Sequence, residues 1–195
     1  MSDTDREKWD ERYSSGAYTA REHPTRLLAD WLPQLPRGRA LDVACGAGRN
    51  SLFLAEHGYD VDAIDISSVA LARARATAAE RGLKVSWIEA DLESTPLPER
   101  RYDLIVMVRY THPVLVATLI ELLNDGGFLL CEEHLRTTHD VVGPKTPAFR
   151  MRPNELLGLA TGLRVIYYRE ALVEDPDDRL AALAQLIGCR GAAGF

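Results

Sequence analysis

Several features that would set this chain apart from an ordinary globular protein are missing from its sequence. No apolar run approaches the ~18 residues of a membrane span, and the first residues, MSDTDREKWDER, are too charged for a signal peptide. The few cysteines, Cys45, Cys131 and Cys189, form no CxxC pair, which indicates reduced thiols rather than a disulfide framework. We therefore expect a cytoplasmic protein with no membrane partner.

Basic residues are also in the minority. The 23 Lys and Arg residues face 29 Asp and Glu residues, so the formal net charge is -6. Each phosphate contact on a nucleic acid needs a cation, so this balance argues against a nucleic-acid partner and favours a small molecule. With 195 residues, 46% of them apolar, the chain is expected to form one domain over residues 1–195, as a monomer or homodimer.

Apolar segments alternate with helical segments along most of the chain. Strands are predicted at 39–43, 59–66, 83–90, 102–108, 128–133 and 164–172, and helices at 26–32, 50–57, 67–81, 113–123 and 153–160. Segment 180–189 fits either a helix or a strand, and residues 136–152 lack periodicity, which is typical of a functional loop or lid. This alternation predicts a mostly parallel sheet covered on both faces, with ligands bound at the carboxyl ends of its strands.

The first strand ends in a glycine-containing loop. Gly46 and Gly48 have no Cβ, so a ligand can approach the backbone closely there, and the next helix offers N–H groups that suit a carboxylate or phosphate. A tight strand-to-helix turn with no ligand is the alternative. The third position of a dinucleotide-binding glycine pattern is Ser51 here, and the chain has room for one nucleotide site, so both features argue against NAD.

Acidic residues end the next two predicted strands. Asp65 lies seventeen residues after Gly48, close to the spacing of an acid that accepts both hydroxyls of a ribose. Its alternative role is a surface acid beside the helix that begins at Ser67. Asp91 could accept from an adenine amino group while Leu92 covers the ring, or it could simply form a turn. Together these residues indicate a mononucleoside-type cofactor.

Residues 41–65, LDVACGAGRNSLFLAEHGYDVDAID, together with Asp91-Leu92 and the strand over 103–110, resemble class I S-adenosylmethionine-dependent methyltransferases. The segment that begins at Arg49 and the Trp9…Tyr13 element are similar to the tellurite-resistance methyltransferases and their small relatives. The resemblance covers residues 9 to about 172. It implies an α/β, Rossmann-like, doubly wound sheet of seven strands, mostly parallel with the last strand antiparallel, and helices on both faces. Residues 1–36 would form a helical cap over the cofactor and acceptor sites, and 37–195 the core.

The same resemblance implies S-adenosyl-L-methionine as cofactor and S-adenosyl-L-homocysteine as product. The loop at 44–48 would hold the methionine part, Asp42 would orient that loop and the cofactor ammonium, and Asp65 would bind the ribose. The full set implied for the cofactor is Trp9, Tyr13, Asp42, Ala44, Gly46, Gly48, Arg49, Asn50, Asp65, Ile66, Asp91, Leu92 and Arg109.

Four residues are candidates for the catalytic side of the site: Arg109, Tyr110, His112 and His134. Methyl transfer mainly needs alignment of acceptor, methyl and sulfur, and a base only if the acceptor must lose a proton. Arg109 ends a buried run and would bind an anion or pair with Glu132 or Glu133. His112 precedes Pro113 and could cap a helix instead. Glu132, Glu133, Arg150 and Arg152 also lie near the expected pocket mouth.

The sequence departs from the tellurite-type pattern after the sixth predicted strand. Those relatives carry a histidine and arginines there, whereas this chain has EDPDDR at 174–179, which does not favour an oxyanion. The histidines lack metal-ligand spacing, so no metal is expected. We expect in-line methyl transfer to a small acceptor, such as a thiol, a metalloid or another small polar compound. The alternatives are an RNA or protein methyltransferase and a non-catalytic S-adenosylmethionine-binding regulatory domain.

Overall fold

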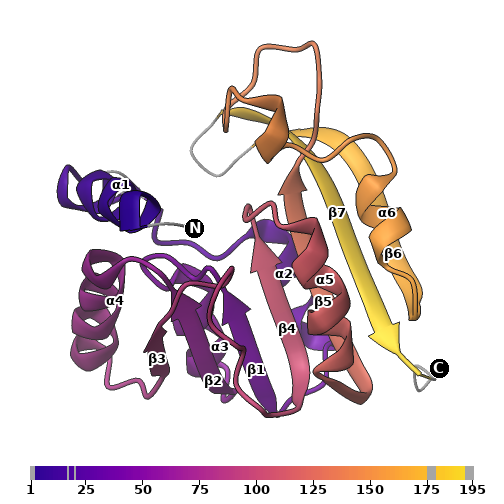
Figure 1. The fold of residues 1–195 in the computed structure, drawn as a ribbon. Coiled ribbons are helices and arrows are strands. Elements are labelled where there is room, and N and C mark those ends of the chain that lie inside the picture. The colour runs from indigo at the N-terminus through magenta and orange to yellow at the C-terminus, as the bar shows by residue number, and fades with distance from the viewer. Residues whose placement is uncertain (1–2, 17, 20, 175–178, 192–195) are drawn as a thin grey trace.

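Seven strands form one mixed sheet in the computed structural model, which describes residues 3–16, 18–19, 21–174 and 179–191 (Figure 1). The strands are β1 (Arg39–Val43), β2 (Asp60–Asp65), β3 (Ser86–Glu89), β4 (Tyr102–Val108), β5 (Leu123–His134), β6 (Leu163–Glu174) and β7 (Leu180–Arg190). Their order is β3-β2-β1-β4-β5-β7-β6. Strands β1 to β5 pair in parallel, and β7 runs antiparallel to both β5 and β6. The predicted doubly wound sheet with an antiparallel last strand is confirmed.

Helices cover both faces of this sheet. They are α1 (Asp3–Ser14), α2 (Arg26–Trp31), α3 (Arg49–Glu56), α4 (Ser68–Glu80), α5 (Pro113–Glu121) and α6 (Glu155–Leu159), with short 3-10 turns η1 (Leu32–Gln34) and η2 (Pro147–Phe149). Strand β4 shows the two layers, because Ile105 and Met107 pack in the core that includes α5 and α6. Leu104 and Val106 pack in the core that includes α2, α3 and α4. This explains why β4 is apolar at almost every position.

The start of α4 follows the sequence prediction, and the start of α6 does not. The Ser67 hydroxyl accepts the Ala70 N–H at 3.1 Å and caps α4. Helix α6 is shorter than the predicted 153–160, because Asn154 adopts a left-handed φ of 62° and becomes the residue before the helix. Pro153 therefore precedes the helix, and its placement inside the first turn was wrong.

Residues 124–127, Asn-Asp-Gly-Gly, have the sequence of a turn between the predicted helix at 113–123 and strand at 128–133, but they form the irregular first part of β5. Leu123 pairs with Tyr102 and Phe128 with Leu104, so the register shifts between the two pairs. A Cβ on Gly127 would lie 2.9 Å from the Tyr102 carbonyl oxygen, so the close approach of the two backbones needs a glycine there. The sequence showed the turn residues but not that they continue to pair with β4.

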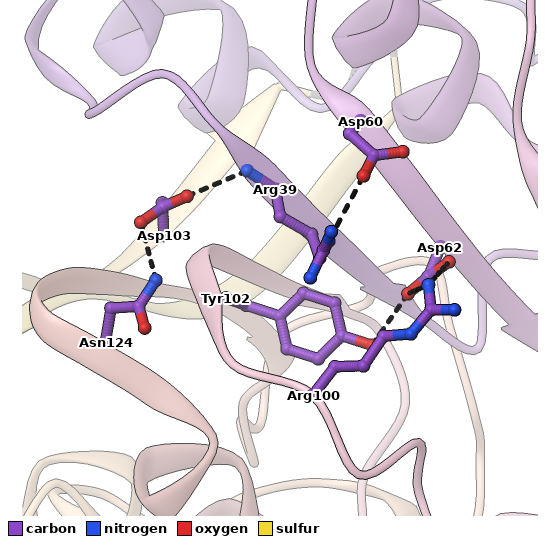
Figure 2. A network of polar contacts seen from close by, with 7 residues as sticks. All are labelled: Arg39, Asp60, Asp62, Arg100, Tyr102, Asp103 and Asn124. Carbon is purple, nitrogen blue, oxygen red and sulfur yellow. Dashed lines mark hydrogen bonds and ion pairs between the residues drawn. The ribbon is translucent and has the colours of Figure 1, made fainter.

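Polar side chains join the amino ends of β1, β2 and β4, at the edge of the sheet away from the glycine loop (Figure 2). Tyr102 donates its hydroxyl to the buried carboxylate of Asp62 at 2.9 Å, and Arg100 lies 3.3 Å from the same oxygen. Asp103 accepts from the Arg39 N–H at 2.8 Å. These bonds fix the register of the three strands and so set the positions of their carboxyl ends.

Candidate functional site

The glycine loop is held open by backbone geometry and tied to the end of β2. Ala44, Gly46 and Gly48 have positive φ angles of 54°, 57° and 80°. The N–H of Gly46 donates to Asp65 Oδ2 at 2.7 Å and that of Ser67 donates to Asp65 Oδ1 at 2.9 Å. Burial raises the pKa of Asp65, and these backbone hydrogen bonds oppose the rise. Each carboxylate oxygen has two acceptor sites, so Asp65 can still accept the hydroxyls of a ribose.

Asp42 lies beneath this loop, almost fully buried. The Ser51 hydroxyl donates to its Oδ2 at 2.5 Å, and burial raises the pKa of Asp42 to about 7. Ser51, at the position where a dinucleotide fold has its third glycine, is therefore a structural partner of Asp42.

The first residues of α3 hold the preceding chain segment. Asn50 Oδ1 accepts the Thr25 N–H at 2.9 Å, and Arg49 Nη1 donates to the His23 carbonyl at 3.3 Å. The side chains of both residues therefore reach toward residues 23–25. Their cofactor-binding role stays a prediction.

Helix α1 lies over the glycine loop at the edge toward which the arrows of β4 and β5 point (Figure 1). The Tyr13 hydroxyl sits against Gly46, where an added Cβ would come within 2.3 Å of its oxygen. Burial and the nearby Asp65 raise the pKa of Tyr13. The ring of Trp9, one turn earlier, lies 6.3 Å from the ring of Tyr13.

Three hydrogen bonds that sequence reasoning missed hold α1 in this position. Asp10 Oδ1 accepts from the Ser67 hydroxyl at 2.6 Å and from the Val69 N–H at 3.3 Å. Arg73 donates to the Tyr13 carbonyl at 3.2 Å. These partners are almost sixty residues apart in sequence, and no local pattern marks them.

The expected adenine side is apolar. Ile66 and Leu92 are 6% and 7% exposed. Asp91 forms the turn that was its alternative role, since its Oδ1 accepts the Glu93 N–H at 2.9 Å. The predicted contact between Asp91 and the adenine amino group stays a prediction.

Arg109 lies at the end of β4 with a strained, left-handed φ of 60°. Its N–H donates to the Glu132 carbonyl at 2.6 Å, and its Nε lies 3.4 Å from Glu132 Oε1. Gln185 of β7 donates to the other Glu132 oxygen at 2.9 Å. The ion pair with Glu132, which the sequence left open, is thus present in the structure.

Tyr110, just after β4, carries a phenol whose hydrogen-bonding capacity is unused among the described residues. Its oxygen is buried and has no hydrogen-bond partner among the residues that the structure describes. Burial and the carboxylates of Glu93, Asp91 and Asp65 raise its pKa, with a smaller contribution from Glu133. The phenol therefore lies among acids from the ends of β2, β3 and β5. An orphaned polar atom of this kind is expected to meet a ligand or a water.

The two candidate histidines have structural contacts. His112 Nδ1 accepts the Leu115 N–H at 3.1 Å and so caps α5, while its ring stacks on Tyr110 with 5.9 Å between centroids. His134 is 6% exposed, and a Cβ on Gly143 would approach its ring to 2.5 Å. His134 is thus covered by the loop over 136–152.

That loop is braced from within. The Arg150 guanidinium donates to the carbonyls of Pro144, Leu135 and Val142 at 2.6, 3.0 and 3.1 Å. Arg136 donates to the carbonyls of Pro147 and Arg150. Arg150 therefore supports the loop, and Arg152 pairs with Glu155 at 3.2 Å.

Two further sequence predictions concern charge and metals. Residues 175–178 of the acidic segment lie outside the described residues. Within 3–16, 18–19, 21–174 and 179–191, no group of three or more His, Cys, Asp or Glu residues could hold a metal ion. The three cysteines are free and buried.

The residues gathered here suit a nucleoside with a methionine tail. Asp65 offers paired acceptors, Ile66 and Leu92 offer apolar cover, the glycine loop exposes backbone, and the Tyr110 hydroxyl lacks a partner. Residues 40–127 match the family described as a methyltransferase domain, and the fold resembles that of class I S-adenosylmethionine-dependent methyltransferases.

Within that class the chain resembles the tellurite-resistance methyltransferases. It is 30% identical over 143 residues to the probable S-adenosyl-L-methionine-dependent methyltransferase TehB of Haemophilus influenzae, covering 70% of this chain and 49% of TehB. The crystal structure of TehB superposes with a TM-score of 0.74 at 26% identity, over 93% of this chain and 67% of that one.

A second relative has a different named acceptor. Malonyl-[acyl-carrier protein] O-methyltransferase of Enterobacter lignolyticus is 29% identical over 170 residues, which are 80% of this chain and 66% of that protein. The chain thus spans about half to two thirds of the length of these curated relatives.

Proposed function

We propose that this protein transfers the methyl group of S-adenosyl-L-methionine to a small, uncharged or cationic acceptor and releases S-adenosyl-L-homocysteine. The observation that carries the proposal is the meeting of the glycine loop, Asp65, Leu92 and Tyr110 at one edge of the sheet. When bound, the cofactor would supply an electrophilic methyl on a good leaving group.

The chain's own residues would then bind and orient. Asp65 would accept the ribose hydroxyls and Ile66 and Leu92 would cover the adenine. The backbone at 44–48 and Tyr13 would enclose the methionine part, because the Tyr13 hydroxyl already lies against Gly46. Helix α1 would exclude water from the sulfonium side of the site, as a cap formed by residues 1–36.

The charges near the acceptor side favour a small acceptor without negative charge. Arg109 is paired with Glu132, and Arg150 is directed to loop carbonyls. The carboxylates of Glu93, Asp91 and Asp65 are close enough to the buried Tyr110 phenol to raise its pKa. A thiol, a neutral metalloid species or another small polar compound fits these charges better than an oxyanion.

No separate recognition domain is evident in the described part of the chain to hold RNA or protein. None of its helices there combines the length and apolar character that crossing a bilayer requires. The buried, unpaired thiols suit the reducing cytoplasm as the proposed location.

Thermal unfolding with and without cofactor tests binding. A ligand at one hundred times its Kd stabilises the folded state by about 2.7 kcal/mol, so S-adenosylhomocysteine should raise the Tm of the wild type. Asp65→Ala should lose the shift, whereas Asp60→Ala, at the exposed start of the same strand, should keep it. No stabilisation at millimolar cofactor would reject the proposal.

Transfer is tested with a methyl-labelled cofactor and a panel of thiols, selenite and tellurite. Label in a thiol or another small acceptor without negative charge supports the proposal, and label in selenite or tellurite alone contradicts its charge preference. Label that enters only protein or RNA in a cell extract supports the macromolecular alternative. Binding without transfer to any acceptor supports a regulatory domain.

A further inference from the structure

The hydroxyl of Thr111, in the loop between β4 and α5, faces two acceptors. It lies 3.0 Å from Glu133 Oε2 and 3.2 Å from the carbonyl oxygen of Phe149. A threonine hydroxyl has one hydrogen to donate but can also accept. It can therefore satisfy both neighbours only if one of them donates to it, and a carbonyl cannot donate.

The other neighbour, Glu133, can carry a proton. Its side chain is fully buried on β5, and its other oxygen, Oε1, accepts the Tyr110 N–H at 3.2 Å. Burial raises the pKa of Glu133 to about 8, the adjacent Glu132 adds to the rise, and Arg109 opposes it. Glu133 is also in electrostatic contact with the phenol of Tyr110 and the thiol of Cys131, and both stay neutral near pH 7 because their pKa values are raised.

We propose that Glu133 is a positioning residue which, when protonated, passes a hydrogen bond through the Thr111 hydroxyl to the Phe149 carbonyl and so fastens the loop over 136–152 to the acceptor side of the site. In that state Glu133 donates to Thr111 Oγ1, and Thr111 donates to Phe149. When Glu133 loses its proton, the Thr111 hydroxyl turns to the carboxylate and the Phe149 carbonyl loses its donor.

The place of this relay gives it a role in the proposed methyl transfer. Thr111 follows Tyr110, whose phenol has no hydrogen-bond partner among the described residues, and Phe149 belongs to η2 in the loop that covers His134. Two residues further on, Met151 donates to the His134 carbonyl at 2.7 Å and accepts the Arg136 N–H at 2.9 Å, so the two ends of the loop are joined to each other. The relay is therefore the contact from Thr111 to η2 that depends on the proton of Glu133, and it adds to the contacts that Arg136 and Arg150 make within the loop. Its link to the acceptor rests on the proposed function, while the relay itself does not.

Hydrogen exchange of peptides over 145–151, measured from pH 6 to pH 9 and corrected for intrinsic rates, tests the relay on the whole protein. Wild-type protection should fall about fivefold as pH rises through about 8, the change that one net hydrogen bond produces. Glu133→Gln keeps an N–H donor toward Thr111 at every pH, so its protection should stay high without a step. In Thr111→Val, protection of these peptides should be low at every pH, and Thr111→Ser should restore the fall in protection near pH 8.

A wild type without a step, or a step that persists in Glu133→Gln, would overturn the proposal. If Glu133→Gln does not fold, the contrast between Thr111→Val and Thr111→Ser decides, since only a hydroxyl can relay. Cofactor binding is measured separately by thermal shift. A step without cofactor stabilisation would refute the proposed function alone, and stabilisation without a step would refute the relay alone.

Discussion

Replacing Asp42 by asparagine should change how the stability of this protein depends on pH. Asp42 is 1% exposed and receives one side-chain hydrogen bond, from Ser51. Burial raises its pKa to about 7, whereas an aspartate in an unfolded chain titrates near ~3.9. Between these two values the folded state holds one proton more than the unfolded state.

The sign and size of the effect follow from this difference. Because the folded pKa is the higher one, the contribution of Asp42 is fully present below about pH 4 and is lost as pH rises through about 7. One extra proton in the folded state corresponds to a slope of about 1.4 kcal/mol per pH unit. From pH 5 to pH 7 the wild type should therefore lose about 2 kcal/mol more of its free energy of unfolding than Asp42→Asn does.

Urea unfolding followed by far-UV circular dichroism at pH 5, 6, 7 and 8 measures this slope. Other buried acids titrate in both proteins, so the difference between the two curves isolates Asp42. Asp30→Asn, at a side chain that is 63% exposed, should run parallel to the wild type. Ser51→Ala removes the hydrogen-bond donor that favours the ionised form of Asp42. The stability of this variant should therefore keep falling to a higher pH than that of the wild type. Parallel curves for Asp42→Asn and wild type would refute a buried, protonated Asp42.

Other substitutions test the loop, the cap and the far edge of the sheet. Gly46→Ala places a Cβ 2.3 Å from the Tyr13 hydroxyl, at a residue whose φ is 57°. The thermal shift caused by the cofactor should therefore be smaller, and adding Tyr13→Phe should partly restore it. Unchanged cofactor binding would contradict the placement of α1. Asp10→Ala removes the acceptor that anchors α1, so limited proteolysis should cut within residues 3–14 several times faster, while the rest of the chain resists. Tyr102→Phe removes a hydrogen bond to the buried carboxylate of Asp62, so the free energy of unfolding measured in urea should fall by about 1–3 kcal/mol. A decrease near zero would mean that Arg100 alone satisfies the carboxylate.

A strand could be predicted where one of its faces is buried and the other exposed, or where turn residues mark its two ends. Strands without these features were harder to predict. Strand β7 is buried at every position from Ala181 to Cys189, so its sequence has neither the period of a strand nor that of a helix. Only its pairing with β5 on one side and β6 on the other decides the conformation. The same holds for the start of β5, where pairing with Tyr102 overrides the turn residues at 124–127.

The candidate site was predictable as a set of strand ends, because parallel strands bring their carboxyl ends to one edge. Asp65 could be placed there from its spacing to the glycine loop. The partners of each side chain could not, because they come from distant segments. Asn50 holds Thr25, and Asp10 holds Ser67, and such pairs depend on how α1 and α2 pack rather than on local pattern.

The likeness to TehB is therefore informative about one half of the site and less so about the other. The half proposed to bind the cofactor is built from the glycine loop and Asp65, and both lie in the matched residues 40–127. The acceptor half uses β5, β7 and the loop over 136–152, which lie at or beyond the end of that match. On this side of the site Arg109, which lies within the match, is paired with Glu132, and Arg150 binds loop carbonyls. An oxyanion would have to break one of these contacts to gain Arg109 or Arg150, whereas an uncharged acceptor need only meet the Tyr110 hydroxyl, which has no hydrogen-bond partner among the described residues. For that reason we expect the acceptor panel to favour thiols over tellurite, even though the fold is shared.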